Sequence, residues 1–374
     1  DVTRTISRKQ FIAGTSATVG AMAVGPSRAD DKPKSFTKPP NELVGMTASQ
    51  LSKMLRQKEV SSVEIVRAYL ERIREVQEIN AVVEESETAI EEAKIADSRR
   101  SQSPDSLGPL HGIPVSIKDQ LDVKGMVTAS GIPENRNHVA TEDATAVAKL
   151  RQAGAIVLCK TNVPTGCAHF ETDNSLYGRT NNPHDLTRTP GGSSGGEAAL
   201  IASFGSPLGL GGDEGGSIRL PAHFCGITGI RPSWGRVSVA GSNPQPINNK
   251  PAFWTTGPMA RSVEDLELML NVIAGQDPRD PYTFLVKLRR SNRVSVDKLR
   301  FSIWPGLGLE DTPDPTPETL DALDRAANVL KQQGAIQVNG PPKLNSIYDL
   351  MEAAWDPREI VPDPIRSREG SQRP

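Results

Sequence analysis

The chain has 374 residues, of which 36% are hydrophobic and 24% are charged, a balance typical of a globular protein. Its net charge is −2, it contains no basic stripe, and only 4% of its residues are aromatic. These values argue against a nucleic-acid partner, because such surfaces are usually basic and often carry aromatic stacking residues.

Cysteine and histidine are too few and too scattered for a disulfide framework or a zinc site. The three cysteines, Cys159, Cys167 and Cys225, form no C-x-x-C pair, and the five histidines show neither H-E-x-x-H nor H-x-x-x-H spacing. We therefore expect no metal and no other cofactor.

The N-terminus is similar to an export signal. Arg8 and Lys9 precede a mildly apolar run (11–24), and the sequence SRA at 27–29 offers a small-x-small cleavage site. The run is too short and too rich in Gly, Ser and Thr to span a membrane. We predict a twin-arginine-like signal over residues 1–29 and an exported protein. The alternative is an Ala-rich extension on a cytoplasmic protein.

Helical patterns follow a polar, proline-containing linker at residues 30–46. Ser61 and Glu64 form a capping-box pattern ahead of apolar residues at helical spacing. A second helical stretch covers residues 88–99. From 356 to 374 the chain is polar and broken by prolines, which is typical of a solvated tail. The main domain is therefore predicted over residues 47–355.

A strand–helix–strand pattern lies within this domain. Alternating apolar residues lead up to Lys118, Thr141 is placed to cap a helix that ends at Gly154, and a short apolar strand covers 155–160. A crossover of this kind makes the two strands parallel in a covered sheet. Later segments continue the alternation, with helices beginning at Ser262 and Thr316 and strands at 299–304 and 335–338.

Serines flanked by glycines occur twice, in GGSSGGEAAL (191–200) and in GGDEGGSIR (211–219). The first formally matches the G-x-S-x-G nucleophile elbow. That elbow requires a strand directly before the serine, and the preceding HDLTRTP is not one. The segment also lacks the lysine of a Walker loop, and no complete G-x-G-x-x-G occurs. An α/β-hydrolase and a nucleotide-binding loop are both disfavoured.

A different arrangement uses both serines. A serine nucleophile needs a base and also donors aimed at the developing oxyanion. Gly215 and Gly216 allow consecutive backbone N–H groups to point into one pocket beside Ser217. Lys118 ends an apolar strand, where burial favours the neutral amine that can act as a base. Asp119 adjoins this lysine, but neighbours on a strand point to opposite faces.

These segments strongly resemble the amidase signature family, and within it the fatty acid amide hydrolase-like members. The resemblance lies in TPGGSSGGEAALIASFGSPLGLGGDEGGSIRLPAHFCGITGIRP (189–232), with HGIPVSIKD (111–119), KTNVP (160–164) and GPMARSVEDL (257–266) in support. It extends over about residues 47–338. It implies an α/β fold with a central twisted mixed sheet covered by helices on both faces.

The resemblance also implies roles for individual residues. Ser217 matches the nucleophile of a Ser-cisSer-Lys triad, Ser193 matches the bridging serine after a cis peptide, and Lys118 matches the base. We expect the side chains of Ser193 and Ser217 to lie within hydrogen-bonding reach. The implied oxyanion hole is the backbone of Glu214, Gly215 and Gly216.

Three neighbouring residues have supporting roles with open alternatives. Ser194 either joins the catalytic network or caps the following helix. Asp213 and Arg219 either bind substrate or brace the glycine loop, and we favour the brace.

Two features depart from the family pattern. The family usually has Thr or Ser at Gly212 and a small or apolar residue at Glu214, whose carboxylate would disfavour the oxyanion if it pointed inward. Family members also continue further, so the C-terminal part of the family fold is expected to be missing from 47–355.

The leading function is a serine amidohydrolase that cleaves a small-molecule carboxylic amide through an acyl-enzyme. One alternative is the glutaminase subunit of a tRNA-dependent amidotransferase, which an export signal would disfavour. Another is a degenerate, non-catalytic protein with the amidase fold.

The export signal can be tested directly. Residues 1–35 fused to a reporter that matures only through the twin-arginine route should be exported. Replacing Arg8 and Lys9 by Ala should retain the fusion in the cytoplasm, as measured by cell fractionation. Replacing Lys32 and Lys34 is the matched control, because it removes the same charge outside the signal. Export that is unaffected by the Arg8 and Lys9 change would contradict the prediction.

Overall fold

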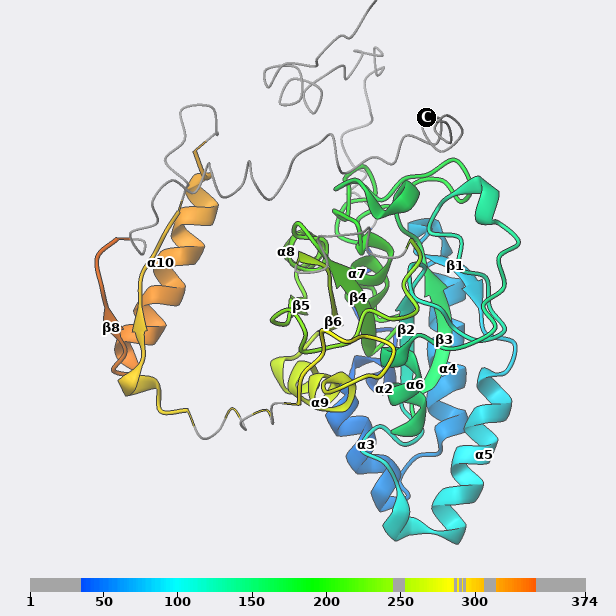
Figure 1. Cartoon of the computed structure of the whole chain (residues 1–374). Coiled ribbons are helices and arrows are strands. Elements are labelled where there is room, and N and C mark those ends of the chain that lie inside the picture. Colours follow the sequence, from blue (N-terminus) through cyan, green and yellow to red (C-terminus); the bar gives the residue numbers. More distant parts are fainter. Residues whose placement is uncertain are drawn as a thin grey trace, which may run out of the picture. The chain divides into compact units, whose positions relative to one another are not determined.

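A six-stranded sheet organises the structure, a computed structural model that describes residues 35–244, 253–285, 288, 291, 294–305 and 314–340 (Figure 1). In sheet order the strands are β1 (Val82–Glu85), β3 (Ile156–Thr161), β2 (Pro114–Lys118), β4 (Leu208–Asp213), β6 (Thr255–Ala260) and β5 (Thr228–Gly229). The predicted export signal (1–29) and polar tail (356–374) lie outside the described residues.

The sheet is mixed. β2 is parallel to β3 and β4, whereas β1, β6 and β5 pair antiparallel with their neighbours. α6 (Thr145–Gln152) lies between β2 and β3 in the chain, which confirms the predicted parallel strand–helix–strand unit. All residues of β2, β3, β4 and β6 are buried, so these strands are covered on both faces. The predicted α/β fold is confirmed.

The helices begin largely where the sequence places their caps. Besides α6 they are α2 (Glu42–Gly45), α3 (Ala48–Gln57), α4 (Ser62–Glu75), α5 (Ala89–Gln102), α7 (Gly195–Ala202), α8 (Arg219–Cys225), α9 (Val263–Ile273) and α10 (Pro317–Gln332). Ser61 and Glu64 form the predicted capping box of α4, and the hydroxyls of Ser262 and Thr316 cap α9 and α10. No helix in the described ranges is both long and apolar enough to cross a membrane.

Two sequence-based boundaries differ in the structure. α6 begins at Thr145 and not after Thr141, because the amides of Ala144 and Thr145 donate to carbonyl groups of distant segments, those of Asp122 and Ala240. The predicted linker (30–46) ends in α2, whose Val44 is fully buried. The folded part of the chain therefore starts before residue 47.

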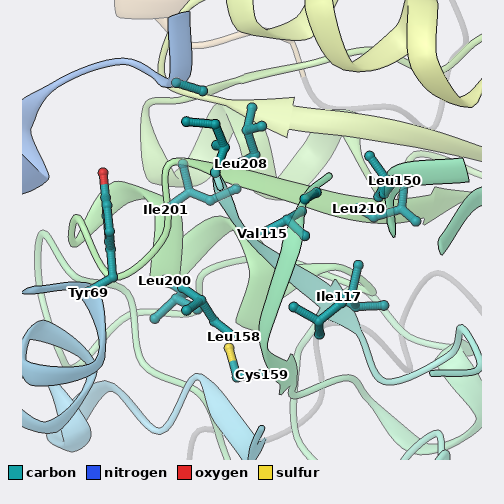
Figure 2. Close-up of a cluster of buried hydrophobic side chains, with 14 of the residues drawn as sticks. Tyr69, Val115, Ile117, Leu150, Leu158, Cys159, Leu200, Ile201, Leu208 and Leu210 are labelled. Atoms are coloured by element: carbon teal, nitrogen blue, oxygen red, sulfur yellow. The ribbon is translucent and has the colours of Figure 1, made fainter. Parts of the chain in front are cut away.

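The sheet places apolar and polar side chains on separate faces of β2. Val115 and Ile117 point into an apolar core that also contains Leu208 and Leu210 of β4 (Figure 2). Residues two apart on a strand share a face, so Ser116 and Lys118 point to the opposite side. Alternation along one strand therefore separates the core from the polar cluster described below.

Glycine in β4 allows α7 to approach the sheet closely. A Cβ atom at Gly209 would lie 2.0 Å from Oε1 of Glu197, a residue of α7. Any larger residue at this position would displace the Glu197 side chain.

The segment from residue 294 to 340 contains a further small unit. β7 (Arg300–Phe301) and β8 (Ile336–Gln337) pair in parallel, with α10 between them in the chain. Both strands are shorter than the predicted 299–304 and 335–338, since only two residues of each join the ladder.

Arg261, directly after β6, ties distant segments together. Its guanidinium donates to the carbonyl groups of Val44 at 3.0 Å, Met46 at 2.8 Å and Ser206 at 3.0 Å, and it lies 4.6 Å from the ring centroid of Phe204. A planar fork with several donors suits such a site, whereas a lysine ammonium cannot span all of these acceptors.

We predict that Arg261→Lys lowers the free energy of unfolding by about 1–3 kcal/mol, because partly buried carbonyl groups lose their donors. Urea denaturation of the purified chain measures this change. Arg67→Lys, on the exposed face of α4, is the matched control and should change stability by less than about 0.5 kcal/mol. Equal effects of the two substitutions would contradict the role assigned to Arg261.

Candidate active site

The three residues of the predicted triad line one pocket. Lys118 is the last residue of β2, Ser193 precedes α7, and Ser217 lies between β4 and α8. Their exposed fractions are 1%, 2% and 8%. Segments far apart in the sequence thus bring an amine and two hydroxyl groups into one sheltered space.

Lys118 is held by a serine and a backbone carbonyl. Its Nζ donates to Ser193 Oγ at 2.7 Å and to the carbonyl oxygen of Gly212 at 3.2 Å. Burial lowers the pKa of Lys118, and this effect outweighs the opposing influence of the Cys167 thiol and of Asp213 and Glu197. The environment therefore favours the neutral amine.

The neighbouring carboxylate does not reach this lysine, as strand alternation predicts. Asp119 Oδ1 lies 3.1 Å from Nζ of Lys160, and both side chains are almost fully buried. Lys160 also donates to the Val127 carbonyl at 2.9 Å and to Thr128 Oγ1 at 3.1 Å. The charge of Asp119 is thus paired with a different lysine.

The two segments that carry Ser193 and Ser217 contact each other through their backbones. The peptide bond between Gly192 and Ser193 is cis, as the resemblance implies. The Ser194 amide donates to the Ser217 carbonyl at 3.0 Å, which joins the two glycine-rich segments. The expected hydrogen bond between the Ser193 and Ser217 hydroxyls is not formed in the described structure. Such bonds often tighten only when substrate is present.

Asp213 holds the loop that carries Ser217. Its carboxylate accepts from the Gly216 amide at 2.9 Å, from the Ile218 amide at 3.0 Å and from two nitrogens of Arg219 at 2.9 and 3.0 Å. Burial alone would raise the pKa of Asp213, but these hydrogen bonds outweigh it and lower the pKa. In this structure Asp213 and Arg219 brace the glycine loop.

The same bonds involve one of the expected oxyanion donors. The Gly216 amide donates to Asp213 in this structure, and its role in an oxyanion hole stays a prediction. The amides of Gly215 and Ser217 donate no hydrogen bond within the described part of the chain. Glu214 is exposed to solvent and also lines the pocket.

Ser194 does not cap α7. It occupies the N-cap position, but its hydroxyl makes no capping bond. Instead Oγ donates to the Gly212 carbonyl at 3.2 Å, the same oxygen that Lys118 contacts. The capping alternative is therefore wrong, and Ser194 supports the end of β4 beside the lysine.

Sequence reasoning missed several residues around the triad. Gln120, Cys167 and Trp254 line the same pocket, and no local motif distinguishes them. Glu197 of α7 is fully buried, and its carboxylate accepts from the hydroxyls of Ser116 and, at 2.6 Å, Thr161. Burial raises the pKa of Glu197 to about 7. The sequence signal that could have revealed Glu197 is its position as the one acidic residue in the otherwise apolar run EAALIA (197–202).

The described ranges hold no group of three or more His, Cys, Asp or Glu side chains arranged to bind a metal. The pocket brings together a buried amine, hydroxyl groups and backbone amides. This combination suits attack on a carbonyl group by an activated serine.

The comparisons with known proteins agree on one family. The sequence model of the Amidase family matches residues 64–359. The chain is 38% identical over 299 residues to fatty-acid amide hydrolase 2 of Homo sapiens, covering 78% of this chain and 54% of that protein. It is 42% identical over 328 residues to a glutamyl-tRNA(Gln) amidotransferase subunit of Roseiflexus castenholzii, covering 83% and 64%.

Solved structures share the fold. A bacterial aryl acylamidase of the amidase signature family superposes with a TM-score of 0.74 at 30% identity, over 83% of this chain and 64% of that one. The peptide amidase of Stenotrophomonas maltophilia superposes with a TM-score of 0.69 at 31% identity, over 78% and 61%. The chain spans from just over half to less than two thirds of the length of these relatives. The family match over most of the chain and the shared fold together establish that this chain belongs to the amidase signature family.

Proposed function

We propose that the chain hydrolyses carboxylic amides, with Ser217 as nucleophile, Ser193 as proton relay and Lys118 as base. The observation that carries the proposal is the buried Lys118 amine, 2.7 Å from Ser193 Oγ, in the pocket that also contains Ser217. A buried lysine with no carboxylate at bonding distance among the described residues is suited to accept a proton.

In the proposed first step, Ser217 Oγ attacks the amide carbon and transfers its proton to Ser193. Ser193 in turn passes its own proton to the neutral Lys118 amine. Lys118 and Ser193 are already in contact, with the amine as donor. The Ser193 hydroxyl hydrogen therefore has to turn towards Nζ before its proton is transferred along this hydrogen bond. The carbonyl oxygen becomes an anion, which the free amides of Gly215 and Ser217 would stabilise.

The later steps return the proton and release both products. Lys118 gives its proton back through Ser193 to the leaving nitrogen, so the C–N bond breaks and the amine departs. Water then attacks the ester formed on Ser217, with the same relay acting as base. The carboxylic acid is released and Ser217 regains its proton.

The names of the relatives support an amide bond as the target. Fatty-acid amide hydrolase 2, the peptide amidase and the aryl acylamidase are all named for amide substrates. The identity of 42% to an amidotransferase subunit favours glutaminase chemistry as a second candidate. The export signal proposed at 1–29 favours the stand-alone hydrolase. Ammonia release from glutamine, compared with release from other amides, distinguishes the two.

A fluorophosphonate probe tests the nucleophile. The wild-type chain should be labelled on Ser217, and Ser217→Ala should abolish labelling, which mass spectrometry of the labelled peptide measures. Ser193→Ala should slow labelling because the relay is broken. Lys118→Ala should slow it by about 10²–10⁴-fold, the usual share of general-base catalysis. Ser98→Ala, exposed on α5, should have no effect. A wild-type chain that ignores the probe would favour the non-catalytic alternative.

The pH dependence tests the base. A neutral amine is the active form, so the labelling rate should fall as pH falls through the lowered pKa of Lys118, below the ordinary lysine value of about 10.4. Lys118→Arg should be nearly inactive throughout, because arginine stays protonated. Lys94→Arg, exposed on α5, should retain the wild-type profile. A labelling rate that does not fall at any pH below about 10.4, as long as the chain stays folded, would contradict this assignment.

A further inference from the structure

Gln120 lies in the proposed active site with its side chain unpaired. It follows Lys118 by two residues, lines the same pocket, and is only 1% exposed. Neither Oε1 nor Nε2 has a hydrogen-bond partner among the described residues. Buried polar atoms are almost always paired in folded proteins, so an unpaired carboxamide in a pocket indicates a ligand group or water as its partner.

The position of this carboxamide depends on Gly212. A Cβ atom at Gly212 would lie 2.6 Å from Gln120 Oε1 and 3.3 Å from Nε2. The carboxamide can therefore reach this place only because residue 212 has no side chain. The Gly212 carbonyl also receives the hydrogen bond from Lys118, so Gln120 lies close to the proposed base.

Trp254 adds a second unpaired donor to the same pocket. Its Nε1 is buried and has no hydrogen-bond partner in the described structure. Together Gln120 and Trp254 present one acceptor, Oε1, and donors on Nε2 and Nε1. A ligand that satisfies them must itself offer both an acceptor and a donor.

The amide that is cleaved does not satisfy this requirement. In the proposed mechanism its oxygen faces the amides of Gly215 and Ser217, and its nitrogen faces Ser193. Both of its polar atoms are then already paired. Gln120 and Trp254 are left for a bound water or for another polar group of the substrate.

We propose that Gln120, assisted by Trp254, binds a second amide group of the substrate, so that the preferred substrates carry two amides. This inference rests on the proposed function. An amide supplies a carbonyl acceptor and N–H donors, which match the donors and the acceptor of the pocket. A carboxylate would only accept, an ammonium would only donate, and a hydrocarbon would leave all these buried atoms unpaired.

Linear diamides with one to four methylenes between their amide groups test the proposal. Each is compared with the isostere in which one amide is replaced by an isopropyl group. For the best spacing, kcat/KM of the full chain should favour the diamide by about 10- to 100-fold, after correction for its two equivalent amides. Gln120→Met keeps the length of the side chain and should bring this ratio close to one. Gln152→Met, on the exposed end of α6, should leave the ratio unchanged.

Gln120→Glu distinguishes recognition from a structural role. It keeps the shape of the side chain but only accepts hydrogen bonds, so the preference should move from the diamide towards an amide that carries an ammonium group. Comparing two substrates on one variant cancels any effect of the new carboxylate on Lys118. A residue needed only for packing would not move the preference in this way.

Binding separates failure of this inference from failure of the proposed function. Calorimetry of the diamides with the Ser217→Ala chain should give a dissociation constant about 10- to 100-fold lower than with the Ser217→Ala, Gln120→Met double variant. This result would support the inference even without turnover. Equal rates for diamide and isostere, or equal binding with and without Gln120, would overturn it and leave water as the partner of Gln120. Absence of labelling on Ser217 would instead overturn the proposed function.

Discussion

The contact on which the site depends is the one between the Lys118 amine, Ser193 and the Gly212 carbonyl. An ammonium group is costly to bury without a carboxylate partner, so this position favours the uncharged amine. Alternation along β2 keeps Asp119 on the other face of the strand, where Lys160 neutralises it. Lys118 and Lys160 are buried in adjacent strands but have different surroundings, because only Lys160 lies beside a carboxylate.

The glycine-rich sequence serves packing as well as chemistry. Gly209 admits the Glu197 side chain between α7 and β4, and Gly212 admits the carboxamide of Gln120. Gly216, at a φ of 129°, adopts a conformation that favours glycine and allows the loop to turn back onto Asp213. The same segments therefore set the distance between layers and shape the pocket.

What could be predicted from the sequence was encoded locally. The capping box at Ser61 and the strand ending at Lys118 depend on residues a few positions apart, and the glycine–serine motifs carry the resemblance to the family. The predicted start of α6 was wrong, because the actual start is set by long-range hydrogen bonds to the carbonyls of Asp122 and Ala240. The contribution of Trp254 to the pocket was not predictable, since no spacing rule links it to Lys118. The hydrogen bond from the Gly216 amide to Asp213 could not be predicted either, because no sequence pattern shows how the Asp213 carboxylate is oriented.

The bonds made by Arg261 also constrain the order in which the chain can fold during synthesis. Its partners Val44 and Met46 precede it by 217 and 215 residues, so their carbonyl groups cannot receive these bonds until β6 and Arg261 have left the ribosome. Contacts that join distant parts of a chain form late and slow its folding. The bonds that Arg261 makes to Val44 of α2 and to Met46 therefore form only after all strands of the six-stranded sheet have been synthesised.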